Sequence, residues 1–169
     1  MVRQLMFIFW FVLIVALCPS SVYPKGSPNK IVITGGGLRR AIEINEREIL
    51  KSFDPWMGQF IDRAKGPVAQ PSRQDPAYDV FFYMKWSGRH STHDRGKLKM
   101  VYTMRYVPGH DGQPGYIYLP GRGEEFYNNN IGTIWREKED GRWHQASAAW
   151  EVTMRRVIVI SNEPQRSPA

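Results

Sequence analysis

The chain has 169 residues and a formal net charge of +7, because 23 Lys and Arg outnumber 16 Asp and Glu. This length suits a single domain with its own hydrophobic core. Cys18 is the only cysteine, so a framework of internal disulfides is excluded.

The chain opens with an apolar run. Arg3 precedes the stretch Leu5–Leu17, in which every residue is hydrophobic, and this pattern is typical of a secretory signal. A membrane-spanning helix needs about 20 apolar residues, so we expect a cleaved signal peptide over residues 1–21. An uncleaved signal anchor and a buried core helix are alternatives. A lipid-modified Cys18 is another, although Leu17 stands where a bacterial lipobox has a small residue.

Removing this segment would leave about 148 residues (169 − 21), a charge of about +6 (7 − 1, for Arg3) and no cysteine. Disulfides and thiol catalysis would then both be excluded. We therefore predict a secreted or periplasmic protein of the cell envelope. Its basic charge favours an anionic envelope polymer or a glycan as partner, and export disfavours nucleic acid. Membrane contact is expected only through an uncleaved signal or a lipidated Cys18.

The expected domain begins with two short strands. Residues 22–29 are rich in Pro, Gly and Ser and predict a linker. Lys30–Thr34 and Ala41–Ile44 predict the strands, because they are short, β-branched or alternating. Gly35–Gly37 lies between them and predicts a turn with positive φ.

A helix is expected next. Asn45 is a favoured N-cap, and Glu48 lies three residues later, as in a capping box. The helix should end near Asp54, because Pro55 disfavours helical geometry at the residue before it. Residues 63–76 contain one glycine and three prolines and predict a long surface loop.

The centre of the chain predicts an antiparallel meander. Tyr78–Trp86 and Leu98–Tyr106 alternate with period two over nine residues each. A turn rich in Gly and Pro connects them to a third strand, Tyr116–Leu119. In the second strand, one face is expected to carry Leu98, Met100, Tyr102, Met104 and Tyr106.

The C-terminal part predicts a hairpin and one more element. Ile131–Arg136 and Arg142–Ala146 flank an Asp-Gly turn. Ser147 can cap a final helix, for which Val157–Ile160 leaves a strand as the alternative. The apolar positions at helical spacing are Trp150, Met154, Val157 and Ile158.

We therefore predict an α+β fold, in which one or two helices pack on an antiparallel sheet. A single domain should span residues 30–161, and residues 162–169 should form a flexible tail.

The sequence lacks the usual signatures of metal and nucleotide sites. His90 and His93 supply two ligands where zinc needs three or four, and His110 is expected at the other end of the intervening strand. Gly35 and Gly37 are not followed by the third glycine of a dinucleotide fingerprint. We expect no metal and no cofactor.

Enzymatic activity has only weak support. No Gly-x-Ser-x-Gly motif is present. If the chain is an enzyme, the first candidates for acid–base catalysis are Glu124, Glu125, Asp94 and His144. A hydrolase acting on an extracellular or cell-wall polymer is therefore the alternative function.

Tyr116–Ile131 (YIYLPGRGEEFYNNNI) combines aromatic, amide and charged residues. Aromatic rings can stack on sugars while polar groups bond the hydroxyls, so this segment favours ligand binding. Filling of the core by the aromatics is the alternative, with Asn128–Asn130 as a turn that tolerates left-handed geometry. The predicted ligand-binding residues are Tyr116, Tyr118, Arg122, Tyr127, Asn129, Arg89 and Arg95.

Several segments resemble a group of small exported bacterial proteins of unknown function, whose N-termini run roughly I-x-I-x-G-P-G-L, P-I-x-I-T-D and F-x-P-W. The matching segments are Lys30–Leu38, Ile42–Ile44, Phe53–Trp56, Asp94–Gly96, Tyr106–Gly109, Pro114–Gly121 (PGYIYLPG) and 129–144. Gly36 replaces the usual proline and Asn45 the usual threonine. The resemblance implies bacterial origin and export and supplies no catalytic residue. The sequence as a whole favours a non-enzymatic binding or accessory domain, and a structural or inhibitory partner protein is a further alternative.

Overall fold

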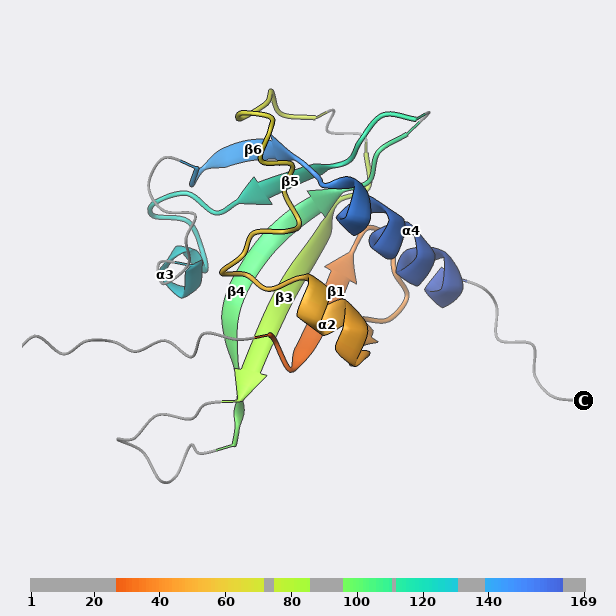
Figure 1. Cartoon of the computed structure of the whole chain (residues 1–169), viewed down its shortest axis with the longest axis vertical. Helices are drawn as coiled ribbons and strands as arrows, with labels where there is room; N and C mark the ends of the chain where they lie inside the picture. The colour runs from red at the N-terminus through yellow and green to blue at the C-terminus, as the bar shows by residue number, and fades with distance from the viewer. Residues whose placement is uncertain (1–26, 72–74, 86–95, 111, 131–138, 163–169) are drawn as a thin grey trace, which may run out of the picture.

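The computed structural model describes residues 27–71, 75–85, 96–110, 112–130 and 139–162. They form the predicted α+β fold, with a six-stranded antiparallel sheet in the order β2-β1-β3-β4-β5-β6 (Figure 1). The strands are β1 (Lys30–Gly35), β2 (Ile42–Ile44), β3 (Tyr78–Lys85), β4 (Leu98–Val107), β5 (Tyr116–Leu119) and β6 (Arg142–Gln145). The helices are α2 (Arg47–Ser52), α3 (Tyr127–Asn130) and α4 (Ala148–Asn162).

The two faces of the sheet are covered differently. Helices α2 and α4 lie on one side, which we call the inner face, and α3 lies on the other, the outer face (Figure 1). Period-two alternation assigns the side chains to these faces. In β3, Tyr78, Val80 and Phe82 are buried on the inner face, while Asp79 and Phe81 are only half-buried on the outer face.

Helix α4 closes the inner face. Trp150, Met154 and Ile158 are buried at positions i, i+4 and i+8 and join the core. The Trp150 ring lies edge-on to Phe53, with centroids 4.8 Å apart. Ser147 Oγ accepts a hydrogen bond from the Trp150 N–H at 3.1 Å. The predicted cap and helix are thus confirmed, and the alternative of a terminal strand is wrong.

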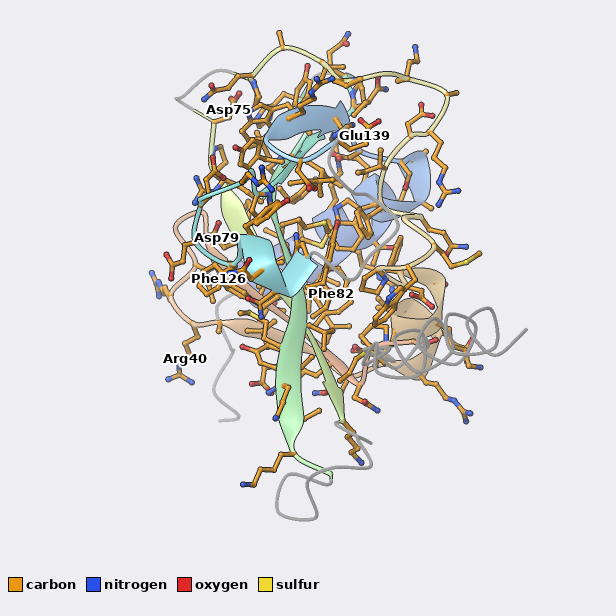
Figure 2. All side chains as sticks on the ribbon, turned by 90° about the vertical axis from the view of Figure 1, so that its left-hand side faces the viewer. Arg40, Asp75, Asp79, Phe82, Phe126 and Glu139 are labelled. Carbon is orange, nitrogen blue, oxygen red and sulfur yellow. The ribbon has the colours of Figure 1, made fainter. Side chains whose placement is uncertain are left out.

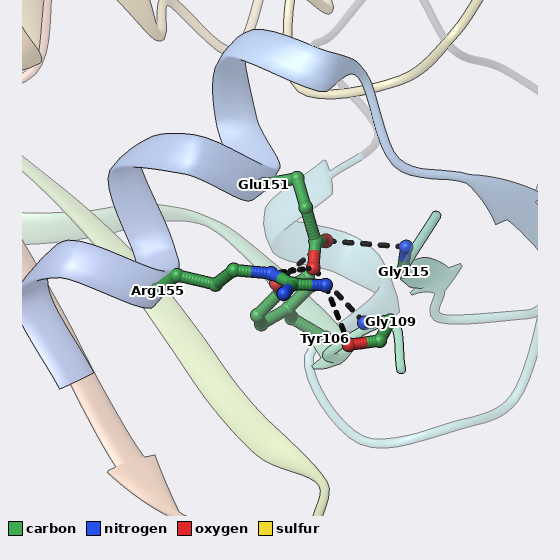
Figure 3. A network of polar contacts seen from close by, with 5 residues as sticks. All are labelled: Tyr106, Gly109, Gly115, Glu151 and Arg155. Carbon is green, nitrogen blue, oxygen red and sulfur yellow. Dashed lines mark hydrogen bonds and ion pairs between the residues drawn. The ribbon is translucent and has the colours of Figure 1, made fainter. Parts of the chain in front are cut away.

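A buried carboxylate fixes α4 to the turn between β4 and β5 (Figure 3). Glu151 is 9% exposed and accepts hydrogen bonds from the Tyr106 hydroxyl at 2.7 Å and from the Gly109 and Gly115 N–H groups at 3.0 and 3.1 Å. Arg155 Nε donates to the same carboxylate at 2.8 Å, and Arg155 Nη2 donates to the Gly109 carbonyl. Burial, and then the bond to Glu151, raise the pKa of Tyr106.

The Gly35–Gly37 turn is confirmed, because all three residues have positive φ. A Cβ on Gly36 would lie 2.2 Å from the Tyr78 ring, so only glycine fits against this core residue. The predicted cap of α2 is wrong, since its N-cap is Glu46 and makes no side-chain cap bond. Glu46 Oε2 instead accepts the Asn45 N–H at 3.2 Å, and the helix begins at Arg47.

The predicted face of β4 is correct only in its second half. Phe82 pairs with Tyr102, but the next β3 residue, Tyr83, pairs with Met100, so Val101 is an extra residue in the ladder. This bulge reverses the side-chain alternation before it. Leu98 consequently lies opposite Lys85 and is 43% exposed, although it was expected in the core.

The segment after α2 follows the edge strand β6 for part of its length. Ile61 and Val68 form isolated bridges with Ala146 and Trp143, and the Val68 N–H donates to the Trp143 carbonyl at 2.8 Å. Part of the expected surface loop therefore protects a sheet edge. Asn29, expected in the linker, bonds β3 through its N–H to the Tyr83 carbonyl.

The signal segment and the strand expected over Ile131–Arg136 lie outside the described residues. Of the tail expected over residues 162–169, Asn162 is the last residue of α4 and residues 163–169 lie outside the described part.

Candidate functional site

The outer face carries a row of polar and aromatic side chains across four strands. Arg105 of β4 pairs with Asp79 of β3 on one side and with Tyr118 of β5 on the other. The Arg105 Nε donates to Asp79 Oδ1 at 2.9 Å. Tyr118 in turn faces Trp143 of β6, with ring centroids 5.1 Å apart. These side chains reach one surface because each stands at an outward position of its strand.

A loop from β5 to α3 folds over this row. Glu124 Oε1 accepts the Tyr118 hydroxyl at 2.7 Å, and Glu124 Oε2 accepts the Gly121 N–H at 3.0 Å. Phe126, at a φ of 66°, packs edge-on against Phe81 with centroids 5.8 Å apart. Figure 2 looks onto this face, with α3 in front of the sheet and Phe126 close to Asp79.

Helix α3 is held to the sheet by asparagine side chains. Asn130, 3% exposed, accepts the Thr103 N–H at 2.9 Å and donates to the Thr103 carbonyl at 2.6 Å. The pairing of β4 with β5 covers Arg105–Val107, so the Asn130 amide bonds β4 at a position that β5 does not reach. Asn129 Nδ2 donates to the Met100 carbonyl at 3.2 Å. The expected left-handed turn over Asn128–Asn130 is wrong, because these residues are helical and Phe126 has the positive φ.

The first of two hollows on this face, the acidic hollow, has a volume of about 240 Å³. Its charged lining residues are Asp79, Arg105, Glu124 and Glu125, and Tyr118 contributes its ring. Three carboxylates and one guanidinium therefore line this hollow, and the guanidinium is already paired with Asp79. The formal charge of the described lining is negative, in contrast to the basic chain as a whole.

The second hollow, the amide hollow, has a volume of about 440 Å³ and is lined by Lys65, Gln70, Gln113, Tyr116 and Gln145, among others. Within the described part of the chain, Lys65 Nζ and the side-chain amides of Gln113 and Gln145 have no hydrogen-bond partner. Exposed or half-buried polar groups around a hollow that make no such bond are available to a ligand.

Tyr118 is held as a hydrogen-bond donor. Burial raises the pKa of Tyr118 to about 12, and the bond to Glu124 contributes in the same direction. The phenol is therefore protonated at any physiological pH and holds the Glu124 carboxylate in place.

The structure separates the predicted ligand-binding residues. Tyr116 and Tyr118 each line one hollow, whereas Ile117 and Leu119 between and beside them fill the core. Core filling is thus wrong as an account of these two tyrosines. Arg122 is exposed on the loop, Tyr127 is half-buried, and Asn129 bonds the sheet. Arg89 and Arg95 lie outside the described residues.

The predicted acid–base residues do not converge. Glu124 and Glu125 line the acidic hollow on the outer face. His144 pairs with the core residue Ile117, is 2% exposed and lies on the inner face, where its Nε2 is 3.7 Å from Glu139. The sheet therefore stands between His144 and the two glutamates, and Asp94 lies outside the described residues.

Sequence reasoning missed Asp79, Arg105 and, apart from Tyr116, the residues of the amide hollow. The alternation of β3 and β4 already places Asp79 and Arg105 on the outer face. No local signal could bring Lys65 to Gln113 and Gln145, since their proximity depends on the segment along β6.

No protein-family model, curated protein or solved structure matches this chain. The resemblance to exported bacterial proteins and the envelope location therefore stay predictions. Among the described residues, no group of three or more His, Cys, Asp or Glu could hold a metal ion. No helix in the described ranges is long and apolar enough to cross a membrane.

Proposed function

We propose that this chain is an exported, non-enzymatic binding domain of the cell envelope that holds a glycan on the outer face of its sheet. The observation that carries the proposal is the alternation in β5, which places Tyr116 and Tyr118 in two hollows on one face. Half-buried rings offer flat apolar surface, and neighbouring amides and carboxylates offer partners for hydroxyl groups.

The charge of the acidic hollow favours a glycan over a uniformly anionic polymer. After Arg105 pairs with Asp79, the carboxylates of Glu124 and Glu125 remain. An anionic group placed there would meet like charge from these two exposed carboxylates, which costs binding free energy. A hydroxyl group, by contrast, donates well to a carboxylate.

The test is retention on insoluble peptidoglycan and on chitin, measured by co-sedimentation of the purified domain. The wild type should be retained, and Tyr118→Ala should reduce retention at least severalfold. Tyr83→Ala is the matched control, since Tyr83 also lies on the outward side of the sheet but lines neither hollow. Absence of retention on both polymers, or equal retention of all three proteins, would contradict the proposal.

Hydrolysis is the second candidate, because Glu124, Glu125 and Asp79 share the acidic hollow, and glycosidases use pairs of carboxylates. If the wild type released soluble sugar in the same assay and Glu125→Gln did not, hydrolysis would replace binding as the proposed function. We expect no release.

A further inference from the structure

The two hollows lie side by side along one strand. Tyr116 and Tyr118 are two residues apart on the same face of β5, which corresponds to roughly 7 Å. On the neighbouring strand β6, Gln145 lies opposite Tyr116, and Trp143 lies opposite Tyr118. Neighbouring units of one sugar chain can bridge such a separation, so a single ligand can occupy both hollows.

The two hollows have opposite charge. The acidic hollow retains the carboxylates of Glu124 and Glu125 beyond its one ion pair. In the amide hollow, Lys65 is the only charged residue among the described lining residues. Its ammonium group has no ion pair within the described part of the chain, and the amides of Gln113 and Gln145 beside it are also without partners there.

We propose that the ligand is a glycan of alternating units, with a neutral unit in the acidic hollow and a carboxylate-bearing unit beside Lys65. This inference rests on the proposed glycan-binding function and specifies its ligand class. A uniformly acidic glycan would bring a carboxylate against Glu124 and Glu125, which is repulsive. A uniformly neutral glycan would bind without an ionic contact to Lys65.

The experiment compares three tetrasaccharides by isothermal titration calorimetry at low salt: one from hyaluronan, which alternates N-acetylglucosamine and glucuronate, neutral chitotetraose, and tetragalacturonate. The wild type should bind the alternating tetrasaccharide about two- to fivefold more tightly than chitotetraose, the range expected for one exposed ion pair. Tetragalacturonate should bind most weakly. The preference should disappear at about 1 M salt, where the Debye length is about 3 Å.

Lys65→Ala should equalise the affinities for the alternating and the neutral tetrasaccharide while leaving chitotetraose binding unchanged. Lys51→Ala is the matched control, because Lys51 is an exposed lysine on α2, which covers the other face of the sheet. It should keep the wild-type preference. A retained preference in Lys65→Ala, or tightest binding of tetragalacturonate, would overturn the inference.

Equal binding of the alternating and neutral tetrasaccharides by the wild type would also overturn the inference but leave the proposed function intact. If none of the three binds and peptidoglycan and chitin are not retained, the proposed function itself fails.

Discussion

The inner and outer faces of the same sheet differ in what they contact: the inner face forms the hydrophobic core, and the outer face borders two hollows. The inner face is closed by α4, and its buried aromatic residues contact one another around Trp150. The outer face is only partly covered by α3 and its loop, and its tyrosines border two hollows. Within β5, adjacent residues serve one face or the other: Ile117 lies in the core and Tyr118 lines the acidic hollow. Stability and binding can therefore be altered separately by substituting alternate residues.

The largest difference in stability between substitutions on the two faces should come from Trp150 on the inner face and Trp143 on the outer face. Trp150→Ala should lower the free energy of unfolding by about 4 kcal/mol, because a fully buried ring is replaced by a cavity. Trp143→Ala should cost less than half as much, since Trp143 is only half-buried on the outer face. Denaturant unfolding followed by circular dichroism measures both. Similar losses in the two variants would contradict the distinction between the faces.

The next largest difference in stability is expected between substitutions of Glu151 on the inner face and Glu124 on the outer face. Glu151→Ala should lower the free energy of unfolding by about 3 kcal/mol, because it leaves the Gly109 and Gly115 N–H groups without an acceptor. Glu124→Ala, on the outer face, should cost clearly less, since the Gly121 N–H that it releases is only partly buried. Thermal unfolding at one pH compares the pair. A larger loss in Glu124→Ala would reverse the predicted order.

Two tyrosines of β4 test whether hydrogen bonding or packing dominates on the inner face. Tyr106→Phe should lower the free energy of unfolding by about 2 kcal/mol, because Glu151 loses a buried donor. Tyr102→Phe should be neutral or stabilise by up to about 1 kcal/mol, since the buried Tyr102 hydroxyl has no hydrogen-bond partner among the residues that the structure describes. Chemical unfolding of both variants tests this, and equal losses would contradict it.

The smallest effect concerns pH. Since folding raises the pKa of Tyr118 from 10.0 to about 12, its contribution to stability is fully present below pH 10 and is lost as the pH rises towards 12. The stability difference between wild type and Tyr118→Phe should therefore shrink over this interval. Isothermal unfolding at pH 9, 10, 11 and 12 measures it. A difference that is constant with pH would contradict the raised pKa of Tyr118, which burial and then the bond to Glu124 produce.

Much of the sheet could be predicted because alternation is a local property of the sequence. Tyr116–Leu119 was predicted with its observed bounds, and Ser147 was identified as a cap. The bulge at Val101 could not be predicted, since it exists only in the pairing of β4 with β3. The same holds for Asn130, whose side chain replaces a strand's peptide group only after the loop has folded back.

The candidate site was predicted in part. The segment 116–130 contained the two tyrosines of the hollows, but composition could not tell which of its residues face outward. The overall positive charge also favoured an anionic ligand, whereas the acidic hollow brings Asp79 of β3 together with the neighbouring Glu124 and Glu125, from two separate parts of the chain. Local charge at a site therefore differs from net charge when the fold brings distant residues together.

The most direct test of glycan binding is a two-dimensional NMR titration of the labelled domain with chitotetraose and with the hyaluronan tetrasaccharide. Backbone amide shifts should concentrate at Arg105, Tyr116, Tyr118, Glu124–Phe126 and Gln145, which line the two hollows. Amides of α2 and α4, on the inner side, should remain unchanged. Shifts confined to α2 or α4, or no shifts with either sugar, would contradict the assignment of the outer face as the binding surface.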